Sequence, residues 1–257
     1  MSHITPSLAW TFHRNTCCWP HQMGVPTPST VGIAAFKEYP NAPLIPLPAA
    51  DIPPLPLRQA IQTRQSCREF AARALPLADL ATLLHAGYGI QERVLVGEYE
   101  LLTRPVPSGG GLYPLEIYLL VRQVAGLPAG IYHYAALGHG LELLAEAPVA
   151  ATSLTNLFLG QTYAADAAVV IVLTAVMART LQKYGDRGYR LILLEAGHVA
   201  QNLNLVAAAY GWGSVNLAGF FDAALAEVFD LDRADEIPLY ALAIGWPRSP
   251  LGGPQRE

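Results

Sequence analysis

Residues 183–202, KYGDRGYRLILLEAGHVAQN, constrain the fold more than any other stretch of this chain. They begin with adjacent Lys183 and Tyr184, pass a basic turn, and continue as an apolar segment with helical periodicity. Four polar residues lie among its leucines, alanines and valines: Glu195, His198, Gln201 and Asn202. A soluble protein seldom buries so many polar groups on an apolar helix without partners for them. We therefore predict that this segment is the central core helix and that its entrance holds the reactive groups.

The composition points to a globular protein with an extra buried surface. Of 257 residues, 52% are hydrophobic and only 14% are charged, which favours a subunit interface. A net charge of −4 without a polybasic block argues against nucleic acid or an anionic membrane as partner. The start of the chain does not resemble a signal peptide, and the longest apolar run, residues 167–178, is shorter than the roughly 20 residues that span a bilayer. We expect a cytoplasmic oligomer.

Two parts of the chain differ in composition. Residues 1–56 hold 11 of the 21 prolines, so we predict an irregular N-terminal arm without a helix or a central strand. Its apolar side chains suggest that it lies across a surface of its own chain or of a partner subunit. Residues 57–257 are the predicted main domain. Three scattered cysteines, Cys17, Cys18 and Cys67, indicate neither a disulfide framework nor a zinc site.

The periodicity of the main domain mixes helices and strands without regular alternation, which favours the α+β class. Helices are predicted at residues 57–64, 77–88, 149–159 and 222–229, with Asp222 as an N-cap, besides the central helix, which we expect to end near Gly211. Strands are predicted at 117–121, 131–134, 141–144, 168–175, 213–217 and 238–245. Residues 91–104 are predicted to be a loop.

Two short segments carry groups that could bind an anion. Residues 64–70, RQSCREF, place two guanidiniums and a hydroxyl close together, which suits a phosphate or an electron-rich ring edge. An ordinary charged helix end remains the alternative. The glycine run after Ser108 frees backbone amides for close approach of a ligand. It matches neither a Walker loop nor a dinucleotide fingerprint, so a simple turn also remains open.

Lys183 and Tyr184 cannot share one helical face, but at a helix end both can converge on a pocket. A lysine acts as a base only if burial or nearby cations lower its pKa, and Arg179, Arg187 and Arg190 could supply that charge. A solvated basic loop is the alternative.

Glu195 and His198 have the E-x-x-H spacing of di-iron bundles, but the second such motif is missing, so we reject a metal site. We predict instead a hydrogen-bonded core histidine and a glutamate tied to an arginine or a backbone donor.

Considered in order, these motifs resemble the SagB/McbC-type thiazoline/oxazoline dehydrogenases of the nitroreductase-like flavoprotein superfamily. The resemblance runs from about Tyr39 to Trp246. Its motifs are R-x-S-x-R-x-F at 64–70, P-S-G-G-G-L-Y-P-L-E at 107–116, K-Y-G-x-R-G-Y-R at 183–190, E-A-G-H-V-A-Q-N-L at 195–203 and a last strand ending in Gly245. One departure is Gly110, where relatives often have alanine, and we expect it to matter little.

The resemblance implies a central mixed sheet flanked by helices, in an intertwined homodimer with FMN at the subunit interface. Arg64 and Ser66 would contact the phosphate or ribityl chain, and Arg68 the N1/O2 edge of the ring. The full set of implied cofactor-binding residues is Arg64, Gln65, Ser66, Arg68, Pro107, Ser108, Gly109, Leu217, Ala218, Gly219, Trp246 and Arg248.

By the same resemblance, Lys183 would be the base or proton relay and Tyr184 its hydrogen-bonding partner in azoline oxidation. The substrate would be a ribosomally made peptide carrying azoline rings, with a cyclodehydratase complex as a partner. Two other functions stay open: an NAD(P)H-dependent reductase of nitro compounds, quinones or dehydroamino acids, and a non-catalytic scaffold subunit.

Overall fold

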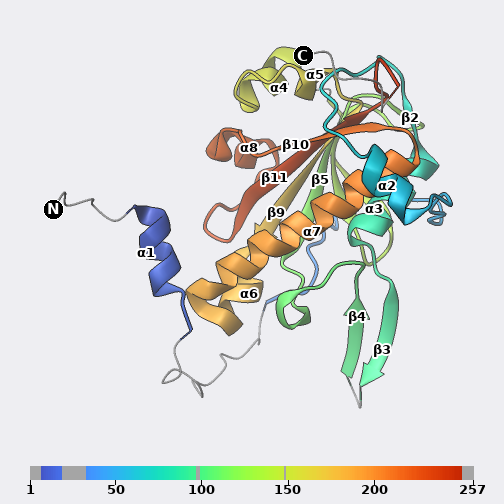
Figure 1. The fold of residues 1–257 in the computed structure, drawn as a ribbon. Coiled ribbons are helices and arrows are strands. Elements are labelled where there is room, and N and C mark those ends of the chain that lie inside the picture. The colour runs from blue at the N-terminus through green and yellow to red at the C-terminus, as the bar shows by residue number, and fades with distance from the viewer. Residues whose placement is uncertain (1–6, 19–32, 97–98, 148, 251–257) are drawn as a thin grey trace.

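The computed structural model describes residues 7–18, 33–96, 99–147 and 149–250, and a seven-stranded sheet forms its centre (Figure 1). In spatial order the strands are β1 (Leu44–Pro46), β8 (Gly140–Ala145), β7 (Gly130–Ala135), β5 (Leu115–Val121), β9 (Val169–Val176), β11 (Glu236–Gly245) and β10 (Gly213–Leu217). These strands pair antiparallel. Parallel pairing is added at the β10 edge, where Ser66 bridges Ser214, and in a separate short pair, β2 (Leu75–Pro76) with β6 (Val124–Ala125).

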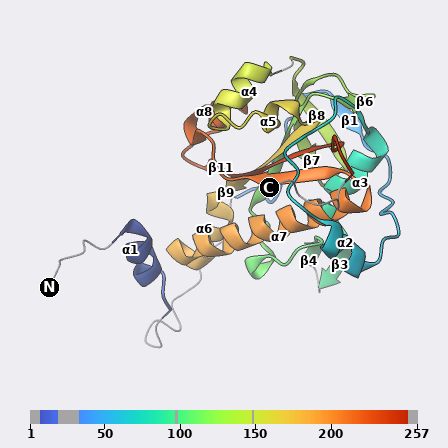
Figure 2. The same cartoon turned by 45° about the horizontal axis from the view of Figure 1, so that its top comes forward.

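Helices cover both faces of the sheet, as Figures 1 and 2 show. One face carries α3 (Leu77–Tyr88) and the 22-residue α7 (Gly188–Ala209). The preceding helix, α6 (Met177–Tyr184), leads into α7 through a short turn. The other face carries α4 (Ala151–Leu157), α5 (Tyr163–Asp166) and α8 (Asp222–Val228). None of the helices in the described residues combines the length and hydropathy needed to cross a lipid bilayer.

The alternation of side chains along β9 explains why the sheet is covered twice. Val169, Ile171 and Leu173 point into the core that contains α3 and α7, whereas Val170 and Val172 point into the core with α4, α5 and α8. All eight residues of β9 are buried, which confirms the predicted strand with two buried faces. Because α7 crosses one of these faces, it is the central helix that the sequence predicts.

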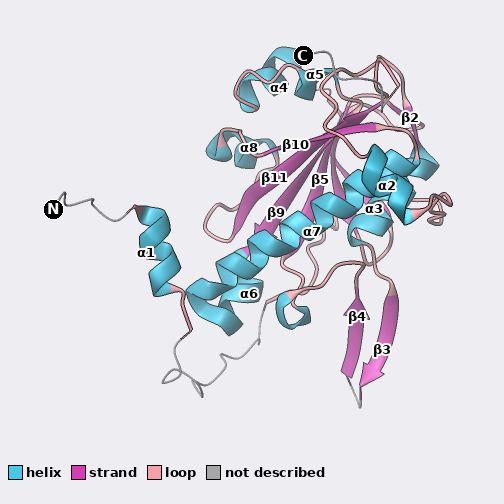
Figure 3. Cartoon of the chain, viewed as in Figure 1, coloured by secondary structure: helices cyan, strands magenta, loops and turns pink. Residues whose placement is uncertain are grey.

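The segment before the glycine run is a hairpin, so the loop predicted at residues 91–104 is wrong. β3 (Glu92–Val96) and β4 (Tyr99–Thr103) pair only with each other and project from the body of the protein (Figure 3). The side chains of residues 92–95 are exposed, so this part of β3 buries no face that would have produced a clear alternating pattern. A smaller correction concerns Asp222, which is the first residue of α8 while Phe221 is its N-cap.

The arm contains a helix, contrary to the sequence prediction. α1 (Leu8–Asn15) begins after Ser7, whose side chain accepts a hydrogen bond from the Trp10 amide, the usual role of serine at an N-cap. Further along, β1 extends the edge of the sheet beside β8. The helix α2 (Leu57–Thr63) then opens the main domain as predicted. Residues 1–6 and 19–32 of the arm lie outside the described residues.

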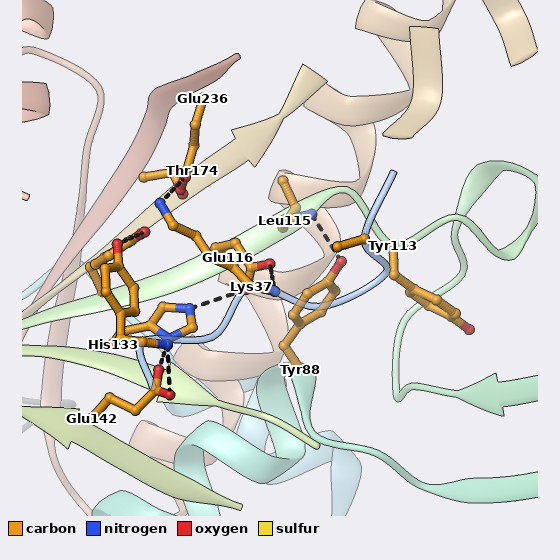
Figure 4. A network of polar contacts seen from close by, with 12 residues as sticks. Lys37, Tyr88, Tyr113, Leu115, Glu116, His133, Glu142, Thr174 and Glu236 are labelled. Atoms are coloured by element: carbon orange, nitrogen blue, oxygen red, sulfur yellow. Dashed lines mark hydrogen bonds and ion pairs between the residues drawn. The ribbon is translucent and has the colours of Figure 1, made fainter. Parts of the chain in front are cut away.

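Residues 34–39 of the arm lie on the chain's own sheet and are held there by buried polar groups (Figure 4). The Lys37 ammonium is 2.6 Å from a Glu236 oxygen. The backbone amides of Lys37 and Tyr39 donate to Glu116 and Glu142, at 3.1 and 3.0 Å. These contacts give the arm a fixed course over the sheet, which its proline content alone does not predict.

His133 joins the two glutamates of this network across the sheet. Its ring nitrogens lie 2.6 Å from Glu142 and 3.2 Å from Glu116, and Arg179 is 2.7 Å from Glu116. Burial alone lowers the pKa of His133, but the hydrogen bonds with both glutamates outweigh it and hold this pKa above its ordinary value. The cluster therefore favours a protonated histidine between carboxylates.

Candidate active site

The pair Lys183–Tyr184 forms the last turn of α6, where the chain reverses into α7. Gly185 follows with φ = 54°, a conformation that glycine adopts most easily. Both side chains are half-buried, and the Lys183 ammonium lies 5.5 Å from the centre of the Tyr184 ring. The pair therefore sits at a helix end, the position in which adjacent residues can converge.

Gly110 is the point on which the two side chains converge. A Cβ atom built on Gly110 would lie 2.8 Å from Lys183 Nζ and 2.8 Å from the Tyr184 hydroxyl. A methyl group there would require the ends of both side chains to shift, and the expectation that glycine at this position matters little stays a prediction. Among the described residues no hydrogen bond joins Lys183 directly to Tyr184, so both polar ends are available to a third group.

A buried network holds the glycine loop against α7. The Tyr88 hydroxyl donates to Glu195 at 2.6 Å and accepts from the Leu115 amide at 3.2 Å. The Ser108 hydroxyl accepts from the Tyr113 amide at 2.9 Å. Burial raises the pKa of Glu195, although hydrogen bonds with Ser108 and Tyr88 act in the opposite direction. Glu195 on α7 thus helps to hold the glycine loop in place through its hydrogen bonds with Ser108 and Tyr88.

Two sequence interpretations of this helix need correction. Glu195 bonds the side-chain hydroxyls of Tyr88 and Ser108, not an arginine or a backbone donor. Arg104 stacks 4.1 Å from the centre of the Tyr88 ring. His198 is exposed on α7 and is not a core histidine. Glu195 is buried and His198 is exposed, so the two side chains lie in different surroundings.

The three arginines that could have influenced Lys183 are engaged elsewhere. Arg179 is buried and pairs with Glu116. Arg187 and Arg190 donate to the carbonyls of Thr16 and His13, at 2.7 and 2.5 Å, and so hold the C-terminal end of α1. The basic turn is thus a docking point for the arm.

The predicted anion-binding residues lie at the opposite end of α7, beside the start of β10. The Cys67 amide donates to the Ser214 carbonyl at 2.9 Å, which places the segment 64–68 along that strand. Arg64 and Gln65 are half-buried, and Ser66 and Arg68 are exposed. Within the described part of the chain, the guanidiniums of Arg64 and Arg68 have no hydrogen-bond or carboxylate partner. Two such cations side by side can bind an anion.

The end of the last strand joins this group. The Ala71 amide donates to the Trp246 carbonyl at 2.8 Å, and the Arg248 amide donates to the Glu69 carbonyl at 3.0 Å. The Arg248 side chain bonds the Phe70 carbonyl at 3.0 Å. Trp246 and Arg248 are therefore brought next to the segment 64–70.

Leu217, Ala218 and Gly219 form a third group at the far end of β10. Three residues separate Ser214 from Leu217, which is roughly 10 Å along a strand. Leu217 is buried and Ala218 exposed, while the Gly219 carbonyl accepts a hydrogen bond from Gln161 at 3.0 Å. β10 thus links this turn to the anion-binding segment.

One chain does not bring all the predicted site residues together. Gly109 packs on Leu191 near the start of α7, whereas Ser214, next to the segment 64–68, bonds Asn204 near its end. The thirteen helical steps from Leu191 to Asn204 span roughly 20 Å of helix. Cavities of about 620 and 390 Å³ in the described residues lie along the arm and include none of the predicted site residues.

Sequence reasoning missed Gly110 and Tyr88 as parts of this site. The left-handed φ of 69° at Gly110 can be suspected from a glycine run, but its proximity to Lys183 depends on how α6 meets the loop. Tyr88 ends a helix predicted only from its leucines, and its hydroxyl meets Glu195 from 107 residues away. The sequence carries no signal for that pair.

The chain has recognisable relatives. Residues 61–246 match the nitroreductase family model. The Methanocaldococcus jannaschii protein MJ1384 is 35% identical over 76% of this chain and 93% of its own length. The microcin B17-processing protein McbC of Escherichia coli is 34% identical, and the trifolitoxin-processing protein TfxB of Rhizobium leguminosarum is 32% identical. These two matches span 54% of McbC and 37% of TfxB.

Solved structures agree with these relatives. A structure from Anabaena variabilis superposes with a TM-score of 0.73 at 26% identity, over 92% of this chain and 45% of that one. The E. coli microcin synthetase McbBCD complex, with truncated pro-MccB17 bound, matches with a TM-score of 0.60 at 24% identity, over 94% of this chain and 82% of that one. A structure from Desulfovibrio desulfuricans in complex with FMN shares the fold with a TM-score of 0.51 at 19% identity, over 79% of this chain and 93% of that one. The expected nitroreductase-like α+β fold and the resemblance to McbC are confirmed. The chain belongs to the nitroreductase family.

Proposed function

We propose that this protein is an FMN-dependent dehydrogenase that oxidises thiazoline or oxazoline rings of a ribosomally made peptide to thiazoles or oxazoles. The observation that carries the proposal is the convergence of Lys183 and Tyr184 beside Gly110, in a chain similar to two peptide-processing proteins. A base and a hydroxyl that meet at one point suit removal of a proton from a ring carbon.

The residues at the second end of α7 fit a phosphorylated cofactor. Arg64 and Arg68 are cations without partners among the described residues, and Ser66 is exposed between them, so they would hold the phosphate and the polar edge of FMN. Pro107, Ser108 and Gly109 would line its ring, as the resemblance to flavoproteins of this family implies. FMN supplies the hydride acceptor when it is bound.

A homodimer would unite the two ends of α7. Leu193 and Leu194 are 43% and 61% exposed, and Gly197, His198 and Gln201 continue this exposed face along α7. Two copies packed antiparallel through this face would bring residues 107–109 of one chain towards residues 64–68 of the partner subunit, because a two-fold interface is self-complementary. We therefore propose that each flavin site takes residues from both chains.

The chemistry that this chain would contribute is proton transfer. In its neutral amine form, Lys183 Nζ would accept the proton from the ring carbon alpha to the carbonyl, as the hydride leaves for the cofactor. The Tyr184 hydroxyl would orient the same ring by a hydrogen bond. The half-buried position of both groups limits competing water, which strengthens such interactions.

The proposed substrate is a peptide that already contains azoline rings. The reaction that makes such rings, a cyclodehydration, would have to precede this one, so a cyclodehydratase complex is the proposed partner. A cytoplasmic location remains a prediction from the sequence.

A second candidate is an NAD(P)H-dependent reductase of nitro compounds, quinones or dehydroamino acids. The family match and the similarity to nearly the whole of MJ1384 favour it. Fold and cofactor would be the same, so azoline oxidation is favoured by the Lys183–Tyr184 pair and by the similarity to McbC and TfxB.

Lys183→Ala tests the proposed function in the purified flavin-loaded protein. The rate of azoline oxidation should fall by about 10²–10⁴-fold, the usual contribution of a general base, while flavin absorbance is retained. Arg187→Ala, which removes a nearby cation that contacts α1, should keep the rate. An unchanged rate in Lys183→Ala would falsify the proposal. Bleaching of the wild-type flavin by NADPH without azoline oxidation would favour the reductase, and failure to bind FMN would favour a scaffold.

A further inference from the structure

The helix α6, which ends in Lys183 and Tyr184 beside the start of α7 (Figure 1), buries a charge and no apolar side chain. Of its eight residues only Arg179 and Thr180 are buried. The Thr180 hydroxyl has no hydrogen-bond partner in the described part of the chain, and α6 begins without a side-chain cap. Because a helix this short depends on tertiary contacts, the contacts of Arg179 largely decide its direction.

The Arg179 guanidinium joins α6 to three other segments. It lies 2.7 Å from a Glu116 oxygen on β5, and its Nε donates to the Ala34 carbonyl of the arm at 2.8 Å. A third nitrogen lies 3.5 Å from the Tyr113 carbonyl, at the end of the glycine loop. The Tyr113 amide in turn donates to the Ser108 hydroxyl. One buried side chain therefore relates α6 to the loop that faces it.

The spacing along α6 carries this contact to the candidate site. Lys183 follows Arg179 by four residues, about one turn, so the two lie on the same side of the helix. A tilt of α6 at Arg179 would move the Lys183 amine and the Tyr184 hydroxyl relative to the loop. A buried ion pair adds little net stability, because desolvation offsets its attraction. Such a pair is better suited to fix one arrangement than to hold the fold.

We infer that Arg179 is a positioning residue: through its pair with Glu116 it fixes the direction of α6, and with it the place of the Lys183 amine and the Tyr184 hydroxyl against the glycine loop. This inference deepens the proposed function and rests on it for the reaction. Its geometric content is independent of the substrate, since Arg179 acts through the helix that carries the pair.

Arg179→Met and Lys37→Met, both in the flavin-loaded full-length protein, form the first test. Arg179→Met keeps an apolar stem and removes the three contacts. It should lower kcat for azoline oxidation by about tenfold or more, because misplacement by about 1 Å can cost about 100-fold, with KM and FMN affinity close to wild type. Lys37→Met removes another ion pair of the same network, with Glu236, and should keep the wild-type kcat. Equal loss of kcat in both variants would overturn the inference.

The double variant Arg179→Met/Glu116→Gln separates orientation from stability. The single variant leaves the buried Glu116 with His133 as its remaining cation, so it should lower the free energy of unfolding. The double variant should recover part of that loss in urea unfolding but not kcat, because neither new side chain restores the ion pair. If kcat recovers together with stability, or if neither variant folds, Arg179 holds the fold as a whole and the inference fails.

A readout without turnover comes from the lysine content of the chain, which is only Lys37 and Lys183. Reductive methylation with ¹³C-formaldehyde gives each lysine an NMR signal, which Lys183→Arg assigns. The double variant has the net charge of the wild type, so a narrower or shifted Lys183 signal in it reports a changed position of the amine. Lys37→Met should leave this signal unchanged. An unchanged Lys183 signal in the double variant would refute the positioning role even if kcat fell.

The two proposals fail differently. If the wild-type protein does not oxidise azolines but the double variant still changes the Lys183 signal, the function is wrong and the positioning role stands. If Lys183→Ala abolishes oxidation but Arg179→Met keeps the wild-type kcat, the function stands and the role of Arg179 is wrong.

Discussion

The two ends of α7 carry different kinds of site. At the start of the helix, Lys183 and Tyr184 converge on Gly110 above a buried pair, Tyr88 and Glu195. At its end, Arg64 and Arg68 lie beside β10 with no partner among the described residues. The first end is arranged by contacts within the chain, whereas the second presents charge to something outside it.

This difference separates positioning from binding. A group that moves a proton must be held in place before the substrate arrives, so its supports are buried and bonded. A group that binds an anion can stay solvated until the ligand comes, since its charge does the attracting. The following changes test whether the two ends have these separate roles.

The largest effect is expected from breaking the surface that would bring the two ends together. Leu194→Asp places a charge on the exposed face of α7, where Leu194 is 61% exposed, so it should abolish the dimer and with it most flavin binding. Sedimentation and flavin titration measure both. Leu137→Asp, at a 40% exposed leucine in the turn between β7 and β8, is the control that should leave both unchanged. A wild-type monomer that binds FMN fully would refute shared sites.

Removing a cation should weaken cofactor binding without changing the proton-transfer end. Arg64→Ala should raise the Kd for FMN by about 10–100-fold, the value of a hydrogen bond to a charged group, about 1.5–3 kcal/mol. Fluorescence titration of FMN measures it. Arg233→Ala, an exposed arginine next to the far end of β11, should bind FMN as the wild type does. If kcat falls while Kd is unchanged, Arg64 belongs to the chemical end instead.

Tyr88→Phe removes the support beneath the glycine loop. It removes one hydrogen bond to the buried Glu195 carboxyl group and leaves the Leu115 amide without its partner, which should lower the free energy of unfolding by about 2 kcal/mol. Urea unfolding measures the loss. Tyr132→Phe, which removes one bond to the Pro128 carbonyl, should cost about 1 kcal/mol. If both variants lose the same free energy of unfolding, the hydrogen bond between Tyr88 and Glu195 contributes no more than an ordinary one.

The smallest effect is expected in the pH dependence of the free energy of unfolding, to which Glu195 contributes near the start of α7. Burial raises the pKa of this carboxyl in the folded protein, so the folded state holds its proton more tightly than the unfolded chain does. The free energy of unfolding therefore loses a contribution as pH rises from the unfolded value, about 4.5, through the folded pKa. Glu195→Gln should show a less negative slope in that window, measured by urea unfolding at several pH values. The exposed Glu227→Gln should keep the wild-type slope, and a wild-type slope in Glu195→Gln would contradict the prediction.

The predictability of each part of this protein follows from the range of its interactions. The helices at 77–88 and 188–209 and the strand at 169–176 could be predicted because apolar residues recur at helical spacing in the first two and form a continuous run in the third. The hairpin at 92–103 could not be predicted in this way, since its strands pair only with each other and residues 92–95 are exposed. The helix at 8–15 is held by two arginines about 170 residues away, which a local pattern cannot reveal.

The sequence by itself determined the α+β class, the central helix, and the motifs that point to the nitroreductase family. Those features depend on periodicity and on the order of short motifs, both of which are local. Only the tertiary structure decided which groups meet: Lys183 and Tyr184 at Gly110, Glu195 with Tyr88, and Arg64 far from Ser108 along α7. The physical reason is that a contact between distant segments depends on how helices and strands pack, and packing is a property of the whole core.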